Sequence, residues 1–203
     1  MKSRSVVGLF CLSLSLAPLG LLTGCGKKVT RITTNSTVDL SGKWNDTDSR
    51  LVAEAMMKDV LGKPWLVRYE ERKKTPRLVV SEIRNKSHEH INTQTFAKDI
   101  ERELLNSGRV EFVASKSERD QLRDEKSDQQ QNASVETRLA QGEESGANVM
   151  LIGTINTIVD QEGDQAVLYY QVNMELVEIE SNKKLWIGEH KIKKLVERSS
   201  TKF

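Results

Sequence analysis

The last third of the chain predicts three consecutive long strands. From Gln165 to Glu180 apolar and polar side chains alternate, which is the period of a strand with one buried face. The alternation changes phase at Val177, which indicates a bulge or a bend. The nearly all-apolar run 147–159 before it predicts a central strand covered on both faces. A turn at 181–182 leads to a return strand over 183–196.

Helical and strand patterns alternate in the preceding part of the chain. Phe96, Ile100 and Leu104 lie four residues apart, which predicts a helix with one apolar face. We expect this helix to begin at Asn92 or Thr93. A first helix is expected to begin with Asp46 or Asp48 as its N-cap and to end at Gly62 and Pro64. The other expected elements are a strand at 77–83, a polar loop at 84–92, a strand at 110–114, a highly charged helix or helix plus loop at 117–131, and a short helix at 134–144. This order predicts a mixed α+β domain: one mostly antiparallel or mixed sheet of about four to five strands flanked by about four helices.

The N-terminus has the pattern of a bacterial lipoprotein signal. A basic start is followed by the apolar run 6–22 and by the sequence Leu22-Thr23-Gly24-Cys25. The run is short for a membrane span, which needs about 20 apolar residues. We therefore expect residues 1–24 to be a cleaved signal peptide and Cys25 to carry lipid.

Loss of this signal changes both the charge and the thiol content. The chain has 31 Lys and Arg against 29 Asp and Glu, and two of the basic residues lie in 1–24. The mature chain is then electrically balanced, so the charge gives no indication of the basic surface that nucleic-acid binding requires, and we expect no nucleic-acid partner. Cys11 leaves with the signal and Cys25 is acylated, so thiol catalysis and cysteine-based metal sites are excluded as well.

The rest of the chain divides into a tether, a domain and a tail. Residues 25–46 are polar and contain no proline, so we expect a short flexible tether that reaches about 70 Å at most. Trp44, near its end, is expected to dock on the domain. Residues 47–197 are expected to form the single globular domain, and 198–203 a polar tail.

No residue pattern in the chain indicates catalysis. The phosphate-binding Gly-Lys-Ser/Thr loop, Gly-x-Ser-x-Gly and His-Glu-x-x-His are all absent from the sequence. His88-Glu89-His90, with the distant His190, is the only cluster of possible metal ligands, and it falls short of a complete set. The favoured interpretation is a solvated loop or a loop that contacts a partner. We expect no catalytic residue, no metal, no cofactor and no small-molecule substrate.

Four segments, in this order behind the lipoprotein signal, resemble one known family. They are DLSGKWNDTD at 39–48, VSEIRNKS at 80–87, TFAKDIERELLNSG at 95–108 and GANVMLIGTI at 146–155. They are similar to the LpoB family of lipoproteins, which activate penicillin-binding proteins. The resemblance implies a mixed sheet with flanking helices and no catalytic activity. It also implies anchoring at the periplasmic face of the outer membrane and binding to a bifunctional, class A penicillin-binding protein whose peptidoglycan synthesis it stimulates.

The resemblance also selects a candidate contact loop. Asn85, Lys86 and Ser87 match a family loop in position, and we take the neighbouring His88 and His90 with them as candidate partner-binding residues. The best-known members of the family have a long, proline-rich linker, which this chain lacks. The alternatives are a structural or assembly lipoprotein of an outer-membrane complex and a hydrolase of envelope glycan or peptide.

Overall fold

A computed structural model describes residues 27–138 and 142–197. The predicted signal peptide 1–24, the lipidation site Cys25 and the predicted tail 198–203 lie outside the described residues. The chain divides into two units at Thr34/Asn35, and all regular elements belong to the second unit. None of the helices within the described ranges has the length and apolar character to cross a membrane.

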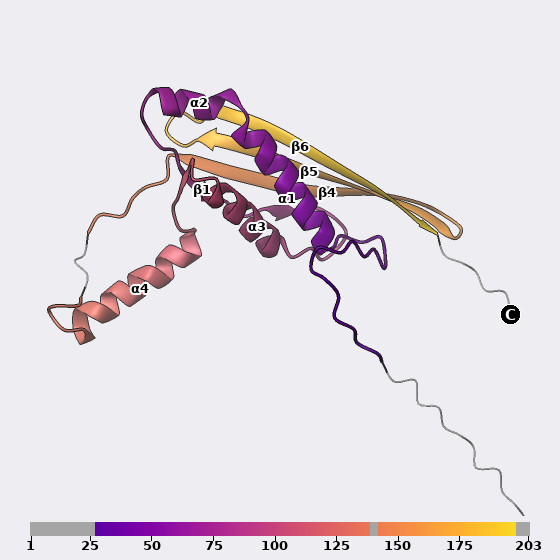
Figure 1. The fold of residues 1–203 in the computed structure, drawn as a ribbon, viewed down its shortest axis with the longest axis horizontal. Coiled ribbons are helices and arrows are strands. Elements are labelled where there is room, and N and C mark those ends of the chain that lie inside the picture. Colours follow the sequence, from indigo (N-terminus) through magenta and orange to yellow (C-terminus); the bar gives the residue numbers. More distant parts are fainter. Residues whose placement is uncertain (1–26, 139–141, 198–203) are drawn as a thin grey trace, which may run out of the picture. The chain divides into compact units, whose positions relative to one another are not determined.

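One mixed sheet of six strands organises the unit that starts at Asn35 (Figure 1). The strand order is β3-β1-β4-β5-β6, and β2 pairs with β4 farther along that strand. Strand β1 pairs in parallel with both β3 and β4, and β2 pairs in parallel with β4. Strands β4, β5 and β6 form an antiparallel meander. The predicted mixed α+β class is confirmed, with six strands where four to five were expected. The strands are β1 (Arg77–Val80), β2 (Arg84–Asn85), β3 (Glu111–Phe112), β4 (Val149–Glu162), β5 (Gln165–Glu178) and β6 (Lys184–Glu197).

The meander follows from the period-two pattern of its sequence. The alternate apolar residues of β5 all lie on one face and are buried: Leu168, Tyr170, Val172, Met174 and Leu176. The register between β5 and β6 shifts between Leu176 and Val177, which confirms the predicted bulge. Both hairpin loops are short, and each contains a residue in the left-handed region, Gly163 with φ 56° and Asn182 with φ 57°.

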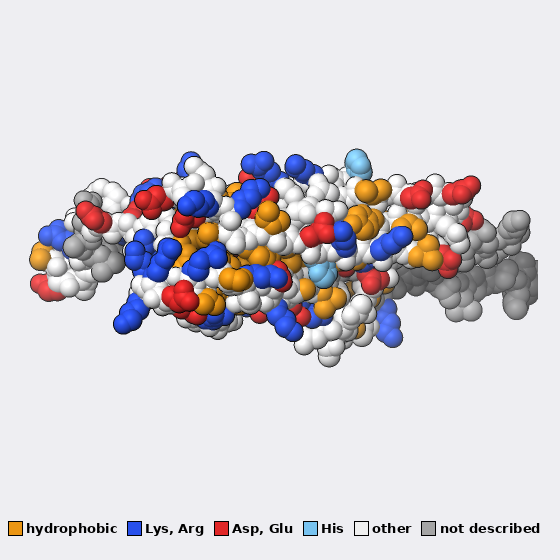
Figure 2. All heavy atoms as spheres, turned by 90° about the horizontal axis from the view of Figure 1, so that it is seen from above, with side chains coloured by type: hydrophobic (Ala, Val, Ile, Leu, Met, Phe, Trp, Pro, Cys, Tyr) orange, Lys and Arg blue, Asp and Glu red, His pale blue; other side chains and the backbone are white. Residues whose placement is uncertain are grey.

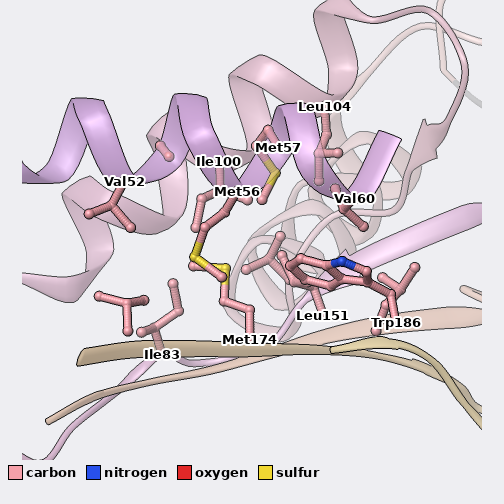
Figure 3. Packing of buried hydrophobic residues seen from close by; sticks show 14 of the residues in the cluster. Val52, Met56, Met57, Val60, Ile83, Ile100, Leu104, Leu151, Met174 and Trp186 are labelled. Carbon is pink, nitrogen blue, oxygen red and sulfur yellow. The ribbon is translucent and has the colours of Figure 1, made fainter. Parts of the chain in front are cut away.

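Helices on one face of the sheet supply the other half of the core (Figure 1). Helices α1 (Asp46–Leu61) and α3 (Thr93–Asn106) pack against each other, and α1 also contacts β6. Figure 3 shows side chains of these helices facing residues of the sheet, with Met56, Ile100 and Leu104 above Met174 and Leu151. All buried core residues among those the structure describes lie within the unit that starts at Asn35, so this unit has a core of its own.

Burial on β4 corrects one expectation. Val149, Leu151 and Ile155 are buried on the helix side, whereas the alternate residues of the same stretch are only half-buried. The strand is therefore covered on one face and not on both. Its apolar outer residues pack against their neighbours on the sheet surface instead of beneath a second layer.

Two helices differ from the sequence-based expectation. Helix α2 (Pro64–Glu71) was not predicted. Pro64 lies in the first turn of this helix, whereas the sequence was interpreted as using it only to end α1. The helix buries Trp65, Leu66 and Tyr69. The helix expected at 134–144 is wrong, because the described part of that segment contains only a turn at 135–137. The segment has no apolar stripe to bury, and so short a helix is marginal without packing.

The boundaries of the other helices were closer to prediction. Asn45, and not Asp46 or Asp48, caps α1; its side chain accepts from the Asp48 N–H while the Asp48 carboxylate accepts from the Asn45 N–H. Asn92 caps α3 as expected. The charged helix α4 (Lys116–Asn132) forms with Ser115 as its cap and buries none of its residues.

Candidate partner-binding site

The candidate loop, residues 84–91, lies beside β4 and is fixed at both ends. Arg84 and Asn85 form β2 and pair with Thr154 and Ile155, and the Lys86 N–H donates to the Ile155 carbonyl at 2.8 Å. The 84–92 segment is thus not wholly a loop, because it contributes this short strand. The neighbouring Ile83 and the last loop residue, Ile91, are both buried. The segment is therefore held against the sheet and the core.

Two of the predicted contact residues shape the loop itself. The Asn85 amide donates to the Glu89 carbonyl at 2.7 Å, and its oxygen accepts from the Ser87 N–H at 2.9 Å. The Ser87 hydroxyl accepts from the Glu89 N–H at 3.1 Å. Bonds of this kind fix a tight turn without regular structure. Asn85 and Ser87 therefore set the conformation that presents the exposed side chains of Lys86, His88 and His90.

Glu89 anchors the loop from below. Its carboxylate accepts the Tyr170 hydroxyl at 2.5 Å and the Trp44 backbone N–H at 3.1 Å. Burial of Tyr170 and its hydrogen bond to Glu89 both raise the pKa of this tyrosine, so it stays a neutral donor. From the sequence, Glu89 was considered only as a possible metal ligand.

Trp44 docks on the domain, as predicted. Its ring packs edge-on against Phe96 and Tyr170, with centroid separations of 5.9 and 5.6 Å. Its indole N–H donates to the Ser49 hydroxyl at 2.9 Å. One aromatic cluster therefore joins the segment before α1, the helix α3 and the strand β5 directly beneath the loop.

The segment before α1, residues 38–45 and here called the strap, is bound to the sheet. Lys194 of β6 makes ion pairs with Asp39 at 2.6 Å and with Asp48 at 2.7 Å. Gly42 has φ 70°, and a Cβ there would lie 2.3 Å from a methyl group of Val196. The last part of the expected tether, 25–46, thus packs against the domain, and Asp46 already belongs to α1.

Charges in the strap stabilise one another. Burial by itself would lower the pKa of Lys194, but hydrogen bonds to Asp39 and Asp48 outweigh it and the pKa is raised. The hydrogen bond from Lys194, followed by that from Asn45, lowers the pKa of Asp39. Lys194 and Asp39 are therefore both charged at neutral pH, and the ion pairs hold the strap in addition to its packing.

The two loop histidines lack a third metal ligand. No group of three or more His, Cys, Asp or Glu side chains within 27–138 and 142–197 is placed to hold a metal. His190 lies on β6, and β5 separates that strand from β4 and the loop. Glu89 is engaged by Tyr170 and Trp44.

A shallow cavity of about 210 Å³ adjoins the loop. Glu89, two residues of the strap and the β4–β5 hairpin line it, with Val159 and Leu168 as apolar contributors. Figure 2 shows that the surface facing the viewer mixes charges of both signs with small groups of hydrophobic side chains. The loop adds a local positive character through Arg84 and Lys86.

Comparison with known protein families identifies the fold. Residues 48–192 match the family described as "Peptidoglycan-synthase activator LpoB". The chain belongs to the LpoB family. The match extends from the first turn of α1 into β6 and includes the candidate loop, so the resemblance found from the sequence is confirmed. Members of this family regulate peptidoglycan synthases and are not catalysts, which fits a non-enzymatic role for the present LpoB-family protein.

Solved structures of low sequence identity are also similar. The C-terminal domain of LpoB from Escherichia coli has 16% identity and a TM-score of 0.42, covering 71% of this chain and 98% of that chain. The NMR structure of E. coli LpoB has 13% identity and a TM-score of 0.39, covering 97% and 96%. Lipoprotein GNA1162 from Neisseria meningitidis has 13% identity and a TM-score of 0.39, covering 62% and 88%. No curated protein sequence matches the chain.

Proposed function

We propose that this LpoB-family protein is a non-catalytic outer-membrane lipoprotein that binds and activates a class A penicillin-binding protein. In this role it regulates cell-wall synthesis and cell shape. The observation that carries the proposal is the family match over 48–192, which spans nearly all of the helices and strands. The acylated Cys25 anchors the protein, and the domain faces the periplasm.

The strap limits how far the domain reaches from its anchor. Because residues 38–45 are bound to the sheet, only residues 26–37 remain as spacer between the lipid and the domain. Twelve residues span about 40 Å when fully extended. The domain therefore works close to the membrane that holds Cys25, and the synthase must present its binding region there.

The exposed side of the candidate loop is the proposed contact surface. Arg84, Lys86, His88 and His90 are exposed on a segment whose backbone is fixed by β2 and by Glu89. A surface that is ordered before binding loses less conformational entropy on association. Its positive character favours an acidic region on the synthase, which would accelerate the encounter at low salt.

A binding experiment tests the loop separately from the function. Residues 27–203 are titrated against each purified class A synthase of the source organism, and we expect saturable binding. Lys86→Glu should weaken it about tenfold, because a charge reversal at the contact replaces attraction with repulsion. Lys74→Glu is the matched control, because Lys74 is exposed before β1, away from the loop. Equal binding by both variants would refute the loop as contact, and no binding by the unaltered protein would refute the function.

A further inference from the structure

Strand β6 leaves a long edge of the sheet without a neighbour. It is the last strand in the order and has 14 residues, whereas β3 at the other end has two. Within the described ranges only β5 pairs with it. The unpaired N–H and C=O groups of such an edge are a template for another strand.

The outward side chains of β6 form a self-complementary series. Ile187, Glu189, Lys191, Lys193 and Leu195 alternate with the inward residues and are all exposed. Ile187 and Leu195 are each 63% exposed. If a second β6 runs antiparallel with Lys191 opposite Lys191, Ile187 faces Leu195 and Glu189 faces Lys193 on both sides of the axis. Apolar and opposite-charge pairs of this kind stabilise neighbouring strands.

Other registers lose this complementarity. Moving the axis two residues to Lys193 places Glu189 opposite Glu197. Moving it the other way to Glu189 places Ile187 opposite Lys191. Moving the axis by one residue still sets outer side chains against outer ones, but about Ile192 it places Lys191 opposite Lys193, and about His190 it places Ile187 opposite Lys193. The sequence of β6 therefore favours one register.

The like-charged pair at the axis is compensated within each chain. The Lys191 ammonium lies 2.5 Å from the Glu189 carboxylate, which also accepts the Gln171 amide at 2.7 Å. The hydrogen bond to Glu189 raises the pKa of Lys191. Two Glu189 carboxylates would thus flank the two Lys191 ammonium groups, and each would also face Lys193 of the second copy.

We propose that β6 pairs edge to edge with β6 of a second copy of this chain, two-fold about Lys191, which joins the two sheets into one. This inference is independent of the proposed function. We take the partner of this edge to be a second copy of the chain, because the charged and apolar side chains of β6 are complementary to those of the same strand in the opposite direction.

Charge exchange tests the pairing in a chain that starts at residue 27 and contains the core described above. Sedimentation velocity should show a concentration-dependent dimer. Glu189→Lys and Lys193→Glu should each raise its dissociation constant at least about tenfold, since both variants oppose like charges twice. An equimolar mixture of the two variants should restore the dimer, because every altered residue then faces an opposite charge. A monomer at all concentrations, or a mixture that remains monomeric, would overturn the proposal.

Disulfide trapping tests the register directly. Both natural cysteines, Cys11 and Cys25, precede residue 27, so a single introduced cysteine is the only thiol. Lys191→Cys should form a linked dimer under mild oxidation, because the spacing of antiparallel partners suits a disulfide. Lys74→Cys, exposed elsewhere, is the control. Equal crosslinking of both, or strong crosslinking that survives addition of Glu189→Lys, would contradict the pairing.

Discussion

Replacement of Lys194 by methionine tests whether the strap is part of the folded domain. The Lys194 side chain is 12% exposed and forms ion pairs with Asp39 and Asp48. The Asp48 side chain is 7% exposed, so Lys194→Met leaves a buried carboxylate without its cation. The methionine fills a similar volume, which makes lost charge and not lost packing the main effect.

The expected loss lies at the low end of the range for a broken buried pair. Removing one partner of such a pair costs about 3–5 kcal/mol. Asp39 is 44% exposed and can return to water, and Asp48 keeps the Asn45 N–H at 3.0 Å. We therefore expect the free energy of unfolding to fall by about 3 kcal/mol. For a domain of this size, that lowers Tm by about 6–12 °C.

Urea denaturation followed by tryptophan fluorescence measures this loss, because Trp44 reports on the strap. Lys74→Met, at an exposed position, should change stability by less than about 0.5 kcal/mol. A second change, Asp48→Asn, in the Lys194→Met background should recover part of the loss. A loss for Lys194→Met that equals the small change in the control would refute the claim that the ion pairs hold the strap.

The same ion pairs give a defined pH dependence. The pKa of Asp39 lies below its ordinary value of 3.8, so its contribution is present above that pH and is lost as the pH falls through the lowered pKa. The pKa of Lys194 lies above its ordinary value of 10.5, so its contribution is lost only as the pH rises through the raised pKa. The difference in the free energy of unfolding between the unaltered protein and Lys194→Met should therefore be constant between about pH 5 and 9. A steep change within that window would contradict the assignment.

Three further perturbations test other parts of the account. Tyr170→Phe removes the hydroxyl group that donates a hydrogen bond to Glu89. The free energy of unfolding should therefore fall by about 1.5–3 kcal/mol, and amide hydrogen exchange in residues 84–91 should become faster. Unchanged exchange would exclude Glu89 as the anchor of the loop. Gly42→Ala places a Cβ against β6 at a positive φ and should destabilise the strap by about 2 kcal/mol, seen as faster proteolysis of 38–45; protection equal to the unaltered protein would contradict this. The hydrogen bond from Lys98, followed by those from the backbone and hydroxyl of Ser115, lowers the pKa of Glu118 to about 2. The start of α4 should therefore lose protection only as the pH falls through about 2, whereas Glu118→Ala, which removes the acceptor for the Ser115 N–H, should lose it at neutral pH. NMR chemical shifts that change near pH 4.5 would refute this.

Local periodicity in the sequence was enough to predict most elements of the fold. The bulge after Leu176 was visible because the alternation of a regular strand keeps its phase, so a shift of phase marks an irregularity in the pairing. Helix α3 was visible through its apolar spacing and the capping Asn92. Helix α2 was missed because Pro64 is equally compatible with the end of one helix and the first turn of the next.

The candidate site was less accessible from the sequence because its contacts are long-range. Lys194 and Asp39 are 155 residues apart, and Glu89 and Tyr170 are 81 residues apart. Nothing in the local pattern selects these partners among the many charged and aromatic residues of the chain. The resemblance pointed to the loop, but only the geometry separates Asn85 and Ser87, which shape it, from the outward Lys86, His88 and His90.

The most direct test of the proposed function is the rate of glycan polymerisation by a class A synthase of the source organism. The rate is measured with lipid II as substrate, with and without residues 27–203. We predict a severalfold, saturable increase, which Lys86→Glu reduces and Lys74→Glu leaves unchanged. An unchanged rate for every class A synthase of the organism would contradict the account.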